Sequence, residues 1–159
     1  MKNKDLFLSI IGAFLATLVA TFFSNTILSA ANLPVVLAST GASAMLVFGL
    51  PLSPVSRPWN LVGGHFFSAI IGVSCHFLIP NILLASSISI PLSMAIMHYF
   101  KCMHPPGGAT AITAVIGGHN IHALGYGFVI LPVFINSIII LSIAMSIATF
   151  RDENPFIDK

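Results

Sequence analysis

Charged side chains are almost absent from the interior of this chain. Between positions 6 and 150 only Arg57 and Lys101 carry a full charge, and neither Asp nor Glu occurs there. Burying a charge in the hydrocarbon of a bilayer is costly, whereas soluble domains carry charge at about a quarter of their positions. A chain with 57% apolar and 6% charged residues cannot build a soluble surface, so we expect it to lie in a membrane.

The uncharged stretches are long enough for several crossings, because a spanning helix needs about 20 mainly apolar residues. Pro, Gly and polar clusters divide the chain into six apolar segments, at 6–30, 34–50, 61–79, 84–101, 106–118 and 123–150. We therefore predict an all-α polytopic membrane protein with about six membrane segments. Positions 1–159 are expected to form a single transmembrane domain with no soluble domain.

The second and fifth segments leave the topology open, because each is either a full crossing or a re-entrant half-helix. Cytoplasmic loops are enriched in Lys and Arg. Six crossings place Arg57 and Lys101 on the same side as the basic residues of both termini, whereas re-entrant segments place them on the opposite side. We therefore favour six crossings, with both termini in the cytoplasm.

A short motif of small residues occurs twice. Gly-Ala-Ser-Ala at 41–44 recurs as Gly-Ala-Thr-Ala at 108–111. Two repeats, at 6–79 and 84–150, would each contain a helix, a broken helix and a helix, and three crossings per copy would make them inverted, a common plan in transporters. The alternative is that small residues recur only because membrane helices pack closely through them.

Two adjacent prolines mark the most informative break in the chain. Pro105 and Pro106 remove two backbone donors and keep the residues before them out of the helical region. One helix must therefore end near His104, and the next begins at Pro106 or Gly107. A helix that begins at membrane depth has unpaired N–H groups and a positive dipole end, which attract an anion.

Other residues complete a predicted anion site. Glycines let a ligand approach the backbone, the Thr110 hydroxyl adds a donor, and in the first repeat Pro34 provides a helix stop followed by N-cap candidates. Because the membrane segments hold no acidic residue, an anion is favoured over a cation. The candidate substrate-binding residues are Lys101, His104, Pro105, Pro106, Gly107, Gly108, Thr110, Ser39, Thr40, Gly41, Ser43, Arg57, His65 and Asn136.

Several of these residues also fit structural roles. Arg57 and Lys101 fit cytoplasmic anchors at helix ends equally well. His65 and Asn136 either line a pore or tie helices together. The same holds for His104, which either donates to an anion or bonds a backbone carbonyl.

Three other classes of function are not expected. The six histidines lack the carboxylates or thiolates that usually accompany them in metal sites of transporters, so we expect neither a metal nor another cofactor. No membrane carboxylate can act as a base, and no Ser, His and Asp arrangement can be assembled, so we do not expect an enzyme. A formal net charge of +2 is too small to suggest a nucleic-acid partner.

The run Met-His-Pro-Pro-Gly-Gly-Ala-Thr-Ala at 103–111 resembles the signature of the HPP family of integral membrane proteins. The segment from Gly41 to His65 is also similar to that family, and the resemblance extends over about 39–136. It implies a membrane protein with about four spans, and nitrite transport as known for plastid and cyanobacterial members. Nitrite is a small monovalent anion, which agrees with the site inferred from the charges and the helix break.

We therefore predict a transporter or channel for a small inorganic anion, nitrite first. Because 159 residues make a thin bundle, we expect a homodimer or larger homo-oligomer. The sequence shows no Ser- and Arg-rich transit peptide, so a bacterial cytoplasmic membrane is expected. The alternatives are a membrane scaffold whose helix breaks serve packing, or a transporter of another small solute.

Overall fold

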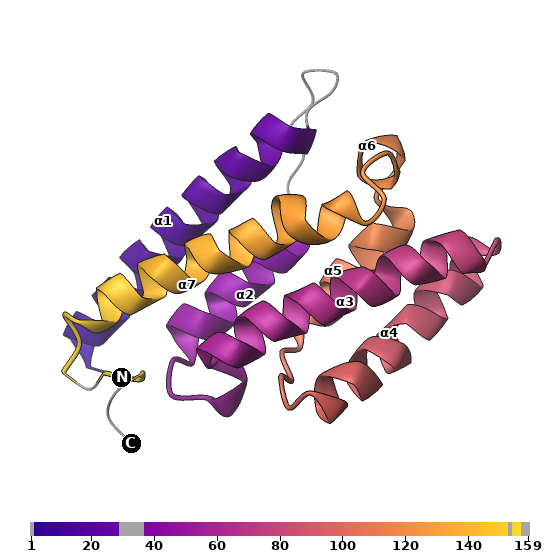
Figure 1. Ribbon diagram of the computed structural model, residues 1–159. Coiled ribbons are helices and arrows are strands. Elements are labelled where there is room, and N and C mark those ends of the chain that lie inside the picture. The colour runs from indigo at the N-terminus through magenta and orange to yellow at the C-terminus, as the bar shows by residue number, and fades with distance from the viewer. Residues whose placement is uncertain (1, 29–36, 153, 157–159) are drawn as a thin grey trace.

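The chain is all-helical over the residues that this computed structural model describes, which are 2–28, 37–152 and 154–156. Figure 1 shows its helices packed side by side. In chain order the elements are α1 (Asn3–Leu28), α2 (Ala38–Gly49), a 3-10 turn (Pro54–Ser56), α3 (Pro58–Leu78), α4 (Ile82–Tyr99), α5 (Pro106–Ile116), α6 (His119–His122), a π-helical turn (Val129–Phe134) and α7 (Ile135–Ala148). The predicted all-α polytopic membrane fold is confirmed.

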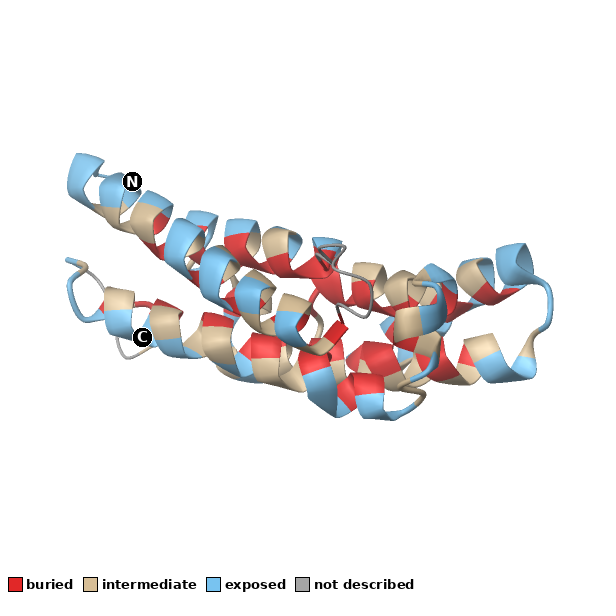
Figure 2. Cartoon of the chain, turned by 90° about the horizontal axis from the view of Figure 1, so that it is seen from above, coloured by how far each residue is buried: buried red, intermediate tan, exposed pale blue. Residues whose placement is uncertain are grey.

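Four of these helical stretches are long and apolar enough to cross a bilayer. They are α1, α3, α4 and the stretch Val129–Ala148, with 26, 21, 18 and 20 residues. Large apolar side chains lie on their outer faces, as Phe7, Phe14 and Phe22 do along α1. In Figure 2 the exposed residues line the outside of the bundle and the buried ones face inward. An outer surface of this kind suits lipid.

Small side chains let α1 pack closely on its neighbours. Its buried positions include Gly12, Ala16, Ala20, Ser24 and Leu28. Residues four apart lie on one face of a helix, so these five form a stripe. Membrane helices approach each other through such small residues, and here the ring of Phe48 in α2 fills the space beside Gly12.

Besides the four-residue α6, two apolar helices are too short to cross a bilayer by themselves. α2 has 12 residues and α5 has 11, which correspond to about 18 and 16 Å against a hydrocarbon thickness of about 30 Å. The non-helical residues 102–104 precede α5 and add at most roughly 10 Å. The fifth segment is therefore a half-helix preceded by a short non-helical stretch. Pro34, the predicted helix stop before α2, lies outside the described residues.

The connections between helices gather at two opposite ends of the bundle. At one end, which we call the terminal end, Ser9 Oγ donates to the carbonyl oxygen of Phe48 (2.7 Å) and Arg151 Nη2 donates to Ser9 Oγ (2.8 Å). At the far end, Asn120 Nδ2 donates to the carbonyl oxygen of Leu28 (2.8 Å). Successive segments therefore run in alternating directions.

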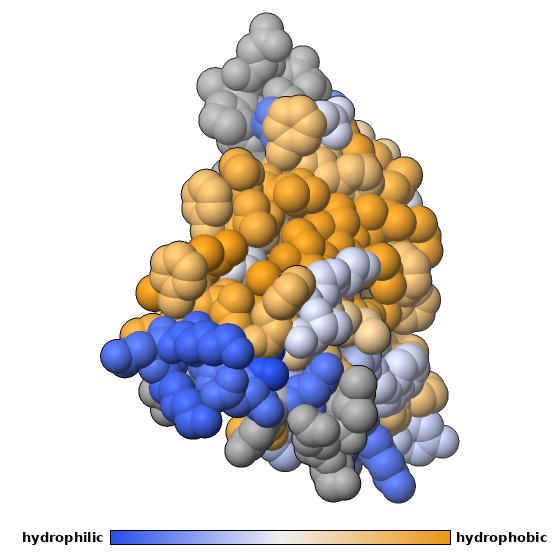
Figure 3. All heavy atoms as spheres, turned by 90° about the vertical axis from the view of Figure 1, so that its left-hand side faces the viewer, coloured by the Kyte–Doolittle hydropathy of each residue, from blue (hydrophilic) through white to orange (hydrophobic). Residues whose placement is uncertain are grey.

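Every Lys and Arg of the described residues lies at the terminal end. Lys2 and Lys4 donate to Asp152 over 2.8 and 3.0 Å, which lowers the pKa of that carboxyl to about 2. Arg57 precedes α3 and Lys101 follows α4 at this same end. Figure 3 shows hydrophilic side chains gathered below an apolar belt. Arg57 and Lys101 thus share an end with the termini, as the six-crossing prediction requires.

The core has a polar layer between two apolar layers. The apolar layer nearer the terminal end comprises Ala16, Ala20, Ala44, Val47, Phe48, Leu61, Ile140 and Ala144. The layer nearer the far end comprises Leu28, Leu37, Ala69, Val73, Ala114, Ile121, Phe128, Val129 and Val133. Buried polar side chains occupy intermediate positions on the same helices, among them Ser24, Thr40, Ser43, His65 and Asn136.

Each of the two predicted repeats contains a long helix, a half-helix and a long helix. α1, α2 and α3 fall within 6–79 except for the first three residues of α1, and α4, α5 and α7 fall within 84–150 except for the first two residues of α4. Corresponding helices run in opposite directions, because α1 begins at the terminal end and α4 at the far end. This order is compatible with an inverted repeat, which stays a prediction.

The last segment differs from the single uninterrupted stretch predicted at 123–150. The π-helical turn Val129–Phe134 interrupts it, and Leu131 there has φ −122° and ψ 112°, outside the helical region. Pro132 follows directly, and proline disfavours a helical conformation in the residue before it. α7 therefore begins only at Ile135, one residue before Asn136.

Lys101 holds the end of α4 through its backbone. It has a φ of 54°, the N–H of Lys101 donates to the carbonyl oxygen of His98 (3.2 Å), and the N–H of Cys102 donates to that of Met97 (2.9 Å). These two bonds form a Schellman motif, in which glycine is favoured at the left-handed position.

We expect the Lys101→Gly substitution to stabilise the folded protein by about 1 kcal/mol, because glycine adopts a positive φ without steric cost. Thermal unfolding in detergent measures the effect. A large loss of stability would show that the Lys101 side chain makes a contact that outweighs the backbone strain.

α3 and α5 approach each other most closely at Gly72. A side chain there would collide with the carbonyl oxygen of Ala111 and lie 2.8 Å from Cβ of Ala114. We expect Gly72→Ala to lower the free energy of unfolding by about 1–3 kcal/mol through overpacking. Gly49→Ala is the control, because nothing lies within 4 Å of the added methyl group. Equal thermal stability of the two variants would contradict this packing.

Candidate functional site

Four buried polar side chains meet between the two half-helices, and we call them the polar centre. Ser43 belongs to α2, His65 to α3 and Thr110 to α5, while His104 belongs to the non-helical residues before α5. Their exposed fractions lie between 0 and 4%. All four were predicted as site residues, and the structure joins them by hydrogen bonds.

The hydrogen bonds of the polar centre run in one direction when both imidazoles are neutral. His104 Nδ1 lies 2.8 Å from the carbonyl oxygen of Val55, which can only accept, so His104 carries its proton on Nδ1. Its Nε2 therefore accepts from Ser43 Oγ, at 3.0 Å. Ser43 Oγ in turn accepts from His65 Nε2, at 2.6 Å. That leaves His65 Nδ1 to accept from Thr110 Oγ1, at 2.7 Å.

Gly64 lets the non-helical backbone before α5 lie directly against α3. A side chain at Gly64 would collide with Cβ of His104 and come within 3.1 Å of the carbonyl oxygen of Cys102. One turn earlier, Asn60 Nδ2 donates to the carbonyl oxygen of Met103 (2.8 Å). Non-helical backbone at membrane depth must be paired within the protein, and α3 provides this pairing.

Gly107 continues this close packing at the start of α5. A side chain there would lie 2.8 Å from both the carbonyl oxygen of Gly64 and Oγ of Ser68. Gly108 faces Ile90 of α4, whose Cδ1 would lie 3.3 Å from an added Cβ. Both predicted site glycines thus serve helix packing in this structure.

A small buried cavity adjoins His65 at the start of α2. It is lined by Leu37, Ser39, Thr40, His65, Val133, Asn136, Ser137 and Ile140. Its volume is about 10 Å³, which suffices for about one water molecule. We call it the central cavity, because it lies between the two apolar layers.

Asn136 joins three helices beside the central cavity. Its Nδ2 donates to Ser24 Oγ (2.6 Å) and Thr40 Oγ1 (3.3 Å), while its Oδ1 has no hydrogen-bond partner although the residue is only 4% exposed. A buried oxygen without a partner is costly. If the amide turns over, both hydroxyls donate to Oδ1 and two N–H donors become free. Asn136 can therefore offer a ligand either an acceptor or donors.

Ser39 and Thr40 lie in the first turn of α2, where the helix dipole is positive. They were predicted as N-caps, but the N-cap is Leu37, which makes no side-chain cap bond. Their own side chains instead line the central cavity. Gly41 lies one residue further on, with nothing within 4 Å of its Cβ position, so it faces open space.

Arg57 and Lys101 do not belong to the polar centre. Both are exposed at the terminal end. Arg57 directly precedes α3 and Lys101 follows the end of α4, so both lie near the membrane surface rather than in the interior of the membrane. The expectation that Lys101 stands beside the site is therefore not met. Among the residues that the structure describes, no Lys or Arg lines the central cavity.

Pro105 and Pro106 shape the outer surface of the bundle. They line an open apolar groove between α2 and α5 of about 690 Å³, together with Ala42, Met45, Leu46, Gly49, Leu50 and Ala109. The two prolines thus lie on this groove and not on the central cavity.

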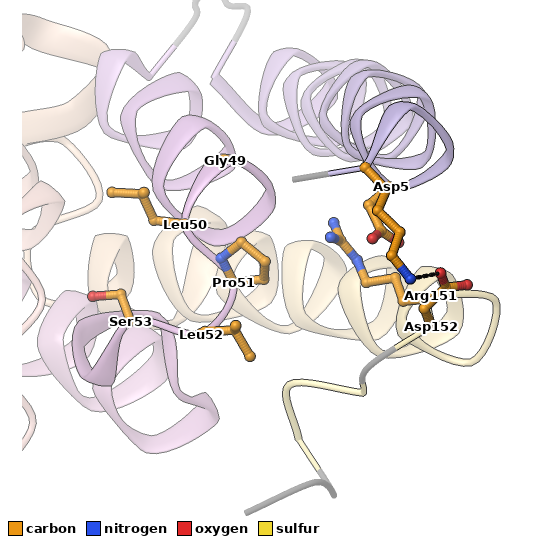
Figure 4. Close-up of a pocket in the computed structure, with 9 residues that line it drawn as sticks. Asp5, Gly49, Leu50, Pro51, Leu52, Ser53, Arg151 and Asp152 are labelled. Atoms are coloured by element: carbon orange, nitrogen blue, oxygen red, sulfur yellow. Dashed lines mark hydrogen bonds and ion pairs between the residues drawn. The ribbon is translucent and has the colours of Figure 1, made fainter.

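A pocket much larger than the central cavity opens at the terminal end. It measures about 680 Å³ and is lined by Lys2, Asp5, Gly49, Leu50, Pro51, Leu52, Ser53, Arg151 and Asp152 (Figure 4). Partial burial lowers the pKa of Arg151, and the neighbouring Asp5 opposes that shift. The sequence analysis did not select Arg151, because a charge after the last span is typical of any membrane protein.

Ser24, Ser137 and the carbonyl group of Val55 are further site groups that the sequence analysis missed. In the sequence, Ser24 could have been noticed as a polar member of the small-residue stripe of α1. A backbone carbonyl group, as at Val55, cannot be identified as a site group from the sequence. Among the described residues, no group of three or more His, Cys, Asp or Glu side chains is placed to hold a metal ion.

Comparisons with known proteins agree with this architecture. Residues 1–156 match the family described as HPP, transmembrane region. Two transmembrane proteins of Dictyostelium discoideum are similar, one 33% identical over 130 residues and one 34% identical over 124. These matches cover 79 and 76% of this chain but 45 and 40% of the relatives, so the chain spans less than half of their length. No solved structure matches it. The chain thus belongs to the HPP family of integral membrane proteins.

Proposed function

We propose that this protein transports a small inorganic anion, nitrite first, through the central cavity. The observation that carries the proposal is a buried space lined by hydroxyl, amide and imidazole groups at the start of a half-helix, between two apolar layers. A polar cavity at the midplane beside a broken helix is the usual substrate site of secondary transporters.

The chemistry of the lining favours an anion. The hydroxyl of Ser39, the first turn of α2 and a turned amide of Asn136 all provide donors or positive dipole ends. Within the described part of the chain, neither a carboxylate nor a thiolate lines the cavity to hold a cation. Donors that replace the hydration shell of an ion can also select it by size.

The conformation described here is closed around the cavity. A volume that holds about one water molecule is too small for nitrite, which has three heavy atoms. Transport therefore requires the helices to move apart at one apolar layer while they stay packed at the other. The terminal-end pocket, with Arg151 and Lys2 on its wall, would serve as the entrance on that side.

A packing role is the second candidate. The four side chains of the polar centre bond one another and Val55, as a scaffold would require. Asn136 argues against it, because its Oδ1 lacks a partner in a cavity that packing alone would close. We propose no catalytic role, since the cavity holds no carboxylate base.

The surroundings of the protein are part of the proposal. Lys and Arg are enriched on the cytoplasmic side of membrane proteins. We therefore place the protein in a bacterial inner membrane with its terminal end facing the cytoplasm.

The open apolar groove between α2 and α5 is a surface on which copies of the chain could associate as a homo-oligomer.

Uptake of labelled nitrite into proteoliposomes tests the proposal. Asn136→Leu keeps the side-chain volume but removes the amide, and a lost hydrogen bond to a charged ligand costs roughly 1.5–3 kcal/mol. We therefore expect the nitrite concentration for half-maximal uptake to rise by about tenfold or more.

The matched control is Ser146→Ala, because Ser146 Oγ only donates to the carbonyl oxygen of Ser142 in its own helix. Uptake by the wild-type protein that equals uptake by protein-free vesicles would refute transport of nitrite. An unchanged half-maximal concentration in Asn136→Leu would refute the assignment of the cavity.

A further inference from the structure

We infer that the polar centre carries one proton with each anion, so that transport is an electroneutral proton–anion symport in which His65 and His104 hold the proton. This inference rests on the transport function proposed above. It is carried by the charge of the site and by the path of its hydrogen bonds.

The site has no fixed positive charge to balance an anion. α2, α5 and α7 contribute no charged or titratable side chain at all. The titratable groups of α3 are His65, Cys75 and His76, and the residues before α5 add Lys101, Cys102 and His104. α4 carries His98 and Tyr99, which are exposed at the terminal end, as Lys101 is. The charged residues of α1 lie at the terminal end. Because a lone charge at the membrane centre is costly, a companion proton must come from these groups.

His65 and His104 are the two groups placed to take that proton. Histidine changes charge near neutral pH, whereas a cysteine thiol can only become negative. The rings of His65 and His104 have centroids 4.9 Å apart, and Ser43 Oγ bridges their Nε2 atoms. His76 stacks on His122 instead, toward the far end, and takes no part in this path.

The hydrogen-bonded chain can move the proton from one ring to the other. A proton binds Thr110 Oγ1 while the original Thr110 O–H bond breaks and its proton forms a new N–H bond at His65 Nδ1. The Nε2–H bond of His65 then breaks as its proton passes to Ser43 Oγ. The original Ser43 O–H bond breaks as that proton forms a new N–H bond at His104 Nε2. His65 ends neutral with its proton on Nδ1, and His104 ends as an imidazolium that still donates to Val55. One positive charge enters and one remains, without any redox change.

The two histidines differ in what they face. His65 lines the central cavity, so a proton there gives the cavity the positive charge that an anion needs. His104 is fully buried against the Val55 carbonyl group, and it lies closer to the terminal end than His65 does. Moving the proton between them therefore switches the affinity of the cavity for an anion.

The wild-type protein provides the first test, in proteoliposomes that contain a pH-sensitive dye. Valinomycin and a potassium gradient set the membrane potential, and nitrite is added outside at alkaline pH, where free nitrous acid is scarce. Protein-free vesicles give the passive leak to subtract. We expect nitrite uptake and internal acidification to rise together, with one proton for each nitrite ion, and the uptake rate to be independent of membrane potential.

Variants test the path itself. Ser43→Ala removes the bridge between the rings, and Thr110→Val, which keeps the side-chain shape, removes the donor to His65. We expect each to slow coupled uptake by at least about tenfold, as is typical when a positioned proton-transfer group is lost. The control is Ser89→Ala, because Ser89 is equally buried but donates only to Ser86 of its own helix.

The outcomes separate the two claims. Nitrite uptake that follows the membrane potential without acidification would overturn the symport and leave transport of the anion intact. Uptake that never exceeds the passive leak would overturn transport and the symport with it. Coupled uptake at the wild-type rate in Ser43→Ala and Thr110→Val, as in Ser89→Ala, would overturn the assignment of His65 and His104.

Discussion

The non-helical backbone before α5 is the constraint on which the rest of the structure depends. Backbone groups at membrane depth must find partners inside the protein, because lipid offers none. Here α3 supplies them, through a bond from Asn60 to the Met103 carbonyl group and through the close approach that Gly64 permits. The break therefore costs little, and it brings His104 into the centre of the bundle.

The position of His104 explains how the site is assembled. Because His104 lies between the Val55 carbonyl group and Ser43, it ties the loop before α3 to α2. His65 then extends the same chain of bonds to Thr110 and to the central cavity. A few polar side chains thus create a polar layer where two apolar layers would otherwise meet.

Local chemistry in the sequence predicted the helices and their breaks well. The apolar runs indicated the segments, and Pro105 and Pro106 indicated where α5 begins. The partners of the polar side chains could not be predicted, because Ser43, His65 and Thr110 meet only through the packing of three helices. Lys101 was misleading for a different reason. It lies three residues from His104 in the sequence, but a Schellman motif turns the chain at Lys101 and leaves its side chain exposed.

Nuclear magnetic resonance of the protein labelled with nitrogen-15 at its histidines tests the central claim most directly. Nitrite is titrated into the detergent-solubilised protein while the ring resonances are recorded. If an anion binds in the central cavity, the resonances of His65 and then His104 shift and saturate, while those of the exposed His98 and His119 do not. Unchanged His65 resonances, or equal shifts at His98 and His119, would contradict the assignment of this site.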